Sequence, residues 1–173
     1  MSDLRPSSEN ILILDFGSQY TQLIARRIRE INVYSEIIPW NKFTELPKGC
    51  QGVILSGSPH SVRDENAPKP DLSKIIDQVP LLGVCYGAQY LAVNYGGNVQ
   101  SSNSREYGRA NLSVVDTSDE LLVGMSMGIQ VWMSHGDTIL GLGDRFETIC
   151  STVDVEFAGF KIVGKKVWGI QFH

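Results

Sequence analysis

Apolar residues in the first half of the chain form short continuous runs, each followed by a polar or glycine-rich turn. The predicted strands span residues 11–14, 33–39, 53–55 and 81–84, and among them only 33–39 is interrupted by polar residues, Ser35 and Glu36. Continuous apolar runs are typical of parallel strands that are buried on both faces. Between the first two runs, residues 20–30 carry apolar positions at helical spacing. This order of strands and helices predicts a mostly parallel sheet covered by helices on both faces.

The pattern changes after Tyr95, where Gly96 and Gly97 end a second predicted helix. Five β-prone segments follow, at residues 110–115, 129–133, 146–150, 157–163 and 167–172. Because short turns join several of them, we expect antiparallel additions at one side of the parallel sheet. A further short helix is expected at residues 72–79. No linker or repeat divides the chain, so we predict one α/β domain over residues 1–173, doubly wound and flavodoxin-like.

Composition narrows the class of protein and its partners. The 173 residues are 42% hydrophobic and 20% charged, which is typical of a globular protein long enough to bury a good core. A net charge of −4 and a pI near 5.3 argue against nucleic acid and membrane surfaces as partners. The polar first ten residues lack the apolar segment of a signal peptide, so we expect none, and the three widely spaced cysteines predict a reduced, cytoplasmic protein. No C-x-x-C or H-x-x-x-H spacing supports a metal site.

The most informative segment is residues 81–87, an apolar strand that runs into the sequence Gly83-Val84-Cys85-Tyr86-Gly87. This G-x-C-x-G pattern before a helix is a nucleophile elbow with cysteine in the place of serine. The glycines allow the close backbone approach that such a sharp turn needs, and the helix N-terminus favours the thiolate of Cys85. The alternative is a buried structural cysteine, since free cysteines are among the most buried residues.

A nucleophilic cysteine needs a base, and the chain contains His60, His135 and His173. His173 ends an apolar β-prone run, so it is expected at the same carboxyl-end rim of the sheet as Cys85. His135 follows another β-prone run, at residues 129–133, and is a rival base. The spacing alone does not decide between these two histidines.

A thiolate that attacks a carbonyl also needs donors for the oxyanion that forms. The loop Ser56-Gly57-Ser58-Pro59 follows the third predicted strand and can turn backbone N–H groups toward the same rim. The N–H of Tyr86, next to the nucleophile, is a second natural donor. The alternative is an ordinary turn, because Gly-Ser-Pro is common in turns.

Six strings resemble class I (triad-type) glutamine amidotransferases, and within them the GMP synthetase branch. They include D-F-G-S-Q-Y, G-V-C-Y-G-A-Q, W-M-S-H-G-D and G-I-Q-F-H, and they lie at residues 11–20, 54–59, 83–89, 105–108, 131–137 and 169–173. The elbow and the final Q-F-H are shared by the wider class, whereas D-F-G-S-Q-Y and W-M-S-H-G-D point to the GMP synthetase branch. The resemblance implies the class I amidotransferase fold.

The resemblance also implies roles for the candidate residues. Cys85 would attack the side-chain amide of L-glutamine, with His173 rather than His135 as the base. Backbone N–H groups of Gly57, Ser58 and Tyr86 would form the oxyanion hole. The remaining implied residues surround the bound glutamine, namely Gln89, Ser134 and His135. Asp137 would face the synthetase partner.

In that family, ammonia passes to an ATP pyrophosphatase domain or subunit that uses ATP and Mg²⁺ to aminate XMP to GMP. No cofactor is expected in the amidotransferase domain itself.

Two departures from the family pattern are visible. Ser58 stands where the family usually has glycine, which a backbone donor does not require unless φ is positive. The family continues from His173 through Pro to a Glu that orients the histidine, and this sequence stops at His173. We therefore expect a domain truncated at its C-terminus, without the synthetase domain, with a poorly held His173 and very low glutaminase activity alone.

Two other classes of function fit parts of the pattern. One is a different cysteine-elbow hydrolase of similar fold, such as a glyoxalase or peptidase, which would use Cys85 without glutamine. The other is a non-catalytic domain that binds glutamine or serves as a scaffold. Labelling of Cys85 by a glutamine analogue would separate the amidotransferase from the first of these.

Overall fold

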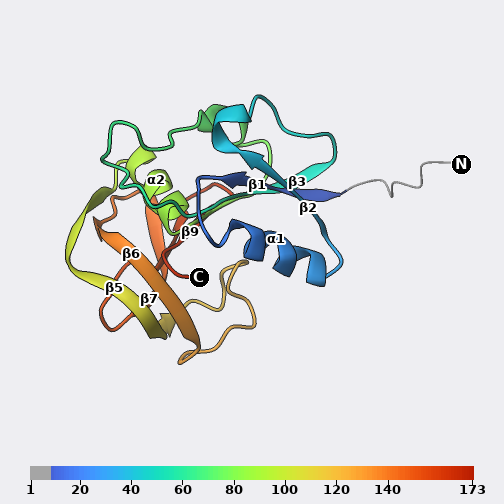
Figure 1. The fold of residues 1–173 in the computed structure, drawn as a ribbon. Helices are drawn as coiled ribbons and strands as arrows, with labels where there is room; N and C mark the ends of the chain where they lie inside the picture. Colours follow the sequence, from blue (N-terminus) through green and yellow to red (C-terminus); the bar gives the residue numbers. More distant parts are fainter. Residues whose placement is uncertain (1–8) are drawn as a thin grey trace, which may run out of the picture.

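The computed structural model describes residues 9–173, apart from the side chains of residues 103–106. Within this part of the chain, nine strands form one mixed sheet in the order β2-β1-β3-β4-β9-β8-β7-β5-β6 (Figure 1). The sheet confirms the predicted α/β class, with a parallel portion and antiparallel additions on one side of it. One segment differs from the prediction: residues 167–172 are expected among the antiparallel additions, but they contain β9 (Val167–Ile170), which pairs in parallel with β4 (Leu81–Val84).

The parallel portion contains five strands, and their carboxyl ends form the rim of the candidate site. They are β2 (Tyr34–Pro39), β1 (Asn10–Asp15), β3 (Cys50–Leu55), β4 (Leu81–Val84) and β9 (Val167–Ile170). The chain crosses from β1 to β2 on one side and places β3, β4 and β9 on the other. Such a reversal of strand order opens a crevice beyond the carboxyl ends.

Four antiparallel strands extend the sheet beyond β9. They are β8 (Gly159–Ile162), β7 (Phe146–Thr152), β5 (Asn98–Val115) and β6 (Gln130–Gly141). Strands β5 and β6 are much longer than the predicted segments at residues 110–115 and 129–133. The first half of β5 is polar, and the second half of β6 alternates buried and exposed positions, so neither half forms a continuous apolar run. As a result, His135 lies within β6 rather than after it.

Helices α1 (Thr21–Glu30) and α2 (Tyr86–Asn94) lie on opposite faces of the parallel portion (Figure 1). The short 3₁₀ helices η1 (Trp40–Lys42) and η2 (Leu72–Lys74) lie in the crossovers on the α2 side. The helix predicted at residues 72–79 is wrong beyond Lys74. Asp77 has φ 64°, which no α-helix allows, and Val79 precedes a proline. No helix among the described residues is long and apolar enough to cross a membrane.

Two apolar clusters fill the two faces of the sheet. Neighbouring residues of one strand contribute to different clusters, as Leu81 and Leu82 of β4 show, because side chains alternate across a strand. The first cluster packs against α2, where Leu91 is fully buried. The second includes Met133 of β6 and Trp168 of β9. Both clusters hold the strand ends that carry the candidate site.

Candidate active site

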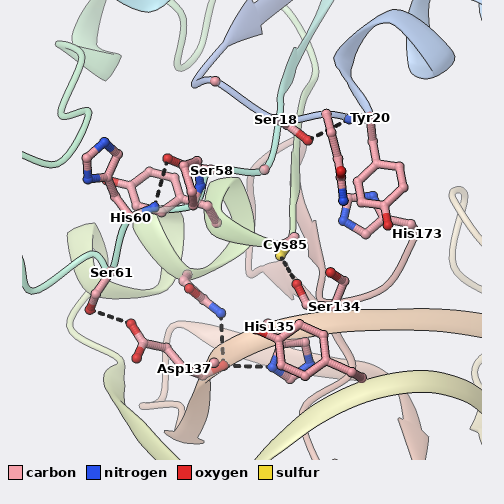
Figure 2. A pocket seen from close by; sticks show the side chains of 18 of the residues that line it. Ser18, Tyr20, Ser58, His60, Ser61, Cys85, Ser134, His135, Asp137 and His173 are labelled. Carbon is pink, nitrogen blue, oxygen red and sulfur yellow. Dashed lines mark hydrogen bonds between the residues drawn. The ribbon is translucent and has the colours of Figure 1, made fainter.

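All eight predicted site residues line one cavity of about 740 Å³ at the carboxyl-end rim of the parallel strands (Figure 2). Its walls come from the loops after β1 and β3, the elbow after β4, the middle of β6 and the end of the described chain. The predicted residues that line it are Cys85, His173, Gly57, Ser58, Tyr86, Gln89, Ser134 and His135. The structure therefore brings all of these residues together around one cavity.

Cys85 sits in a strained backbone conformation between β4 and α2. Its φ of 53° and ψ of −107° lie outside the regions that side-chain-bearing residues normally adopt, as expected for a nucleophile elbow. The turn is tight enough that a Cβ on Gly83 would lie 2.5 Å from the carbonyl carbon of Gly87. A Cβ on Gly87 would likewise lie 2.5 Å from the carbonyl oxygen of Leu55. Only glycine fits at these two positions.

The Cys85 thiol is buried, with 5% of the residue exposed. Burial raises its pKa to about 11; the Tyr86 N–H lowers the pKa, and the Asp137 carboxylate raises it. The thiol donates a long hydrogen bond of 3.5 Å to the Ser134 carbonyl oxygen. The sequence predicts a thiolate favoured by the helix N-terminus, and the expected N–H contribution is present. Desolvation outweighs it, so the resting group is the thiol.

His173 is held by its backbone and by its ring. Its N–H donates to the Trp132 carbonyl oxygen at 2.8 Å, and its carbonyl oxygen accepts from the Trp132 N–H at 3.1 Å. The imidazole lies against the Tyr20 ring, with the centroids 4.3 Å apart. These contacts differ from the expectation of a poorly held histidine, because β6 and the loop after β1 supply supports that are distant in sequence.

The electrostatics of His173 suit a base. Burial lowers its pKa below the ordinary value of 6.5, and His135 lowers it further, so the imidazole is neutral near pH 7. A Cβ built on Gly57 would lie 3.6 Å from Cys85 Cβ and 3.6 Å from His173 Cε1. The two side chains therefore border the same small space beside Gly57.

His135 lies deeper in the wall of the cavity. Its Nδ1 is 2.7 Å from the Asp137 carbonyl oxygen, which can only accept, so Nδ1 carries a proton. The same carbonyl oxygen accepts from Gln89 Nε2 at 3.1 Å, and Gln89 Nε2 also donates to Gln171 Oε1. Burial lowers the pKa of His135, against the raising effect of Asp137. His135 and Gln89 thus brace the backbone of β6 at this wall.

Asp137 supplies a carboxylate to the same wall, with 9% of the residue exposed. Ser61 Oγ donates to its Oδ2 at 2.5 Å, and Arg63 lies 3.8 Å from its Oδ1. Asp137 therefore points into the cavity from β6, and little of it remains exposed for contact with a partner.

The sequence does not single out Ser61 or Tyr20 as site residues, because both reach the site through tertiary contacts. Tyr20 does belong to the D-F-G-S-Q-Y string.

The residues that the structure describes contain no group of three or more His, Cys, Asp or Glu side chains arranged to hold a metal ion. The three cysteines are unpaired.

Comparison with known proteins agrees with the class defined by the elbow and the sheet. The family model for glutamine amidotransferase class-I matches residues 12–173. The chain therefore belongs to the class-I glutamine amidotransferase family.

Individual relatives of the chain carry a more specific name than the family. The chain is 58% identical over 166 residues to the GMP synthase [glutamine-hydrolyzing] of Cytophaga hutchinsonii, a match that covers 96% of this chain and 33% of the relative. The corresponding enzyme of Porphyromonas gingivalis is 54% identical, with 95% and 33% covered. The chain thus spans about a third of the length of these relatives.

The fold has solved counterparts. A GMP synthase subunit from Thermoplasma acidophilum matches with a TM-score of 0.79 and 27% identity, covering 96% of this chain and 84% of its own. A glutamine amidotransferase from Thermotoga maritima matches with a TM-score of 0.74 and 23% identity, covering 95% of this chain and 75% of its own, which supports the fold alone.

Proposed function

We propose that this chain is the glutaminase component of a GMP synthetase, hydrolysing L-glutamine to glutamate and ammonia. The observation that carries the proposal is the strained Cys85 elbow, which opens into a cavity shared with a neutral His173. The high identity to enzymes named as glutamine-hydrolysing GMP synthases supports the choice of substrate. It also supports transfer of the ammonia to a partner.

The reaction follows from the two groups that border the Gly57 space. As the Cys85 sulfur bonds to the amide carbon of glutamine, the thiol proton passes to His173 and the carbonyl electrons move to oxygen. Backbone N–H groups of Gly57, Ser58 and Tyr86 stabilise that oxyanion. Collapse expels ammonia, which takes the proton from His173 and leaves a thioester. Water then gives a proton to His173, attacks the thioester and releases glutamate, and the proton returns to the sulfur.

We assign recognition of the amino-acid end of glutamine to the part of the cavity lining that β6 supplies, which includes Ser134, His135 and Asp137 and is called the β6 wall below. Asp137 supplies a negative charge in the cavity, which suits the α-ammonium group of the substrate. Gln89, Ser134 and His135 surround the bound molecule, and the hydrogen bonds to the Asp137 carbonyl oxygen keep this wall rigid.

The partner is a synthetase domain or subunit that activates XMP with ATP and Mg²⁺ and aminates it to GMP. The length of the relatives supports such a partner, because two thirds of each lies outside the matched region. The cytoplasm is the proposed location, since three unpaired cysteines suit a reducing compartment.

The proposal is tested by intact mass after incubation with 6-diazo-5-oxo-norleucine, a reactive glutamine analogue. We expect one adduct on the wild type and on Cys50→Ala, and none on Cys85→Ala; excess glutamine should slow labelling. Cys50 is the matched control because it lies outside the cavity. Absence of labelling from the wild type, together with turnover of a glyoxal or peptide, would instead support another hydrolase of similar fold.

The choice of base is tested separately. His173→Asn should abolish glutamine-dependent release of ammonia, whereas His135→Asn should act mainly by loosening the β6 wall and raising KM. If His135→Asn lowers kcat as strongly as His173→Asn while KM is unchanged, the assignment of the base is wrong.

A further inference from the structure

Ser56 joins three loops at the rim of the sheet, and it is completely buried. Its backbone N–H donates to the Leu14 carbonyl oxygen of β1 at 3.1 Å. Its own carbonyl oxygen accepts from the Gly87 N–H of the elbow at 3.2 Å. A residue that follows β3 thus ties the end of β1 to the nucleophile turn.

The hydroxyl of Ser56 is used twice. It accepts a hydrogen bond of 2.9 Å from the Phe16 N–H, which can only donate. Its own proton is then directed at the Gly57 carbonyl oxygen, 3.0 Å away. Bulk solvent does not compete for either hydrogen bond, because no part of the residue is exposed.

These bonds fix the directions of two peptide groups. In a trans peptide the C=O and the N–H point in opposite directions. Because Ser56 Oγ holds the Gly57 carbonyl oxygen, the Ser58 N–H points away from Ser56. In the same way, the bond from Gly87 to the Ser56 carbonyl oxygen sets the direction of the Gly57 N–H.

The Ser58 N–H has no hydrogen-bond partner within the described part of the chain. Ser58 and Gly57 both line the cavity, and Gly57 borders the space between Cys85 and His173. An N–H group that is held in direction but left without a partner is available for a charge that appears only during reaction.

We propose that Ser56 is a positioning residue whose hydroxyl locks the Gly57–Ser58 peptide, so that the Ser58 N–H stabilises the oxyanion formed by attack of Cys85. This inference rests on the proposed glutaminase function. It also explains why serine serves at position 58, because the lock comes from Ser56 and the peptide needs no positive φ there.

The test compares two ligands on the same variants. L-Glutamate γ-semialdehyde forms a tetrahedral adduct with the Cys85 sulfur, and its oxygen occupies the oxyanion position. Glutamine, measured in a Cys85→Ala background, reports binding before any oxyanion forms. Ser56→Ala should weaken semialdehyde binding by about tenfold to a hundredfold, below the loss for removing a whole donor. Glutamine binding should change by less than about twofold.

The matched control is Ser35→Ala. Ser35 is also completely buried, and its hydroxyl donates to the Ala25 carbonyl oxygen at 3.1 Å, away from the cavity. This control should leave both affinities unchanged. Thermal unfolding checks that each variant folds; if Ser56→Ala does not, Ser56→Cys, a weaker donor of similar size, gives the same comparison. Ser56→Thr, which keeps the hydroxyl, should restore tight binding of the semialdehyde.

If Ser56→Ala weakens the binding of glutamine and of the semialdehyde equally, Ser56 has a general structural role and the inference is overturned. Unchanged semialdehyde binding would overturn it as well. A wild type that binds neither ligand would instead overturn the proposed glutaminase function, and the inference with it.

Discussion

The resting state of Cys85 gives the most direct test of the electrostatics in the cavity. Burial raises the pKa of its thiol from 9.0 to about 11, so at neutral pH the thiolate is about a hundredfold rarer than for an ordinary thiol. The nucleophilicity of a thiolate rises with its pKa, with a Brønsted coefficient of about 0.4–0.5, which returns roughly a factor of ten. Alkylation of Cys85 near neutral pH should therefore be about tenfold slower than in the unfolded chain, before any loss of access.

The assay is the rate of iodoacetamide alkylation across a pH series, with Cys85 followed by peptide mapping and the urea-unfolded chain as the reference. The folded protein should show a rate that keeps rising tenfold per pH unit up to about pH 10, because the thiol is still protonated there. A plateau with a midpoint at or below about 8.5 would show that the helix N-terminus outweighs burial, and would refute the reasoning.

Asp137→Asn supplies a second arm of the same experiment. The carboxylate raises the pKa of Cys85, but it contributes less than the Tyr86 N–H lowers it, and that lowering is less than the effect of burial. Removing the charge should therefore leave the pKa of Cys85 between 9.0 and about 11. A midpoint below 9.0 in this variant would mean that burial is not the dominant cause.

Three further predictions concern the scaffold. Gly83→Ala should lower the free energy of unfolding, measured by urea titration, by at least about 1–3 kcal/mol, because its Cβ would lie 2.5 Å from backbone atoms. Gly143→Ala, whose Cβ would lie in open space, should not lower it. Asp119→Ala should lower the free energy of unfolding by about 1–3 kcal/mol, because it leaves the buried Trp168 indole N–H unpaired. Asp119→Asn keeps an acceptor and should lower it less, as measured by urea titrations followed by fluorescence. Burial raises the pKa of the Cys150 thiol to about 12. The buried thiol therefore stabilises the folded state below the ordinary thiol pKa, and this stabilisation is lost as the pH rises toward 12. Over that pH range, the urea midpoint of the wild type should fall more steeply than that of Cys150→Ala.

The sequence predicts those parts of the fold and the site whose cause is local. The apolar runs of the first half identify the parallel strands β1 to β4, and the glycines around Cys85 identify the elbow, because both depend on neighbouring residues. The parallel pairing of β9 with β4 is not predicted, because it depends on a partner far away in the sequence. The first half of β5 is not predicted because its residues are polar. It is a strand only because β6 pairs with it, and that pairing is a tertiary event.

The chemistry of the site is harder to predict from the sequence than its position. Local spacing leaves His135 and His173 as equal candidates for the base, because their surroundings come from Tyr20, Trp132 and β6, far apart in the chain. The direction of the Cys85 pKa is misjudged for a related reason. The helix N-terminus is visible in the sequence, whereas the depth of burial is a property of the whole fold.

The two candidate reacting groups, the Cys85 thiol and the His173 imidazole, are both neutral at rest. Stabilisation of the charge that forms during the reaction therefore depends mainly on backbone N–H groups. Transfer of the proton from Cys85 to His173 creates a buried ion pair, which the raised pKa of the thiol and the lowered pKa of the imidazole both oppose. In the proposed mechanism, the transfer becomes favourable only as carbon–sulfur bond formation moves the negative charge onto the substrate oxygen, where the proposed backbone N–H donors stabilise it. Under the proposed mechanism, the thiol stays unreactive until a correctly placed amide arrives, and we expect the rate to depend on how precisely Ser56 holds the Gly57–Ser58 peptide.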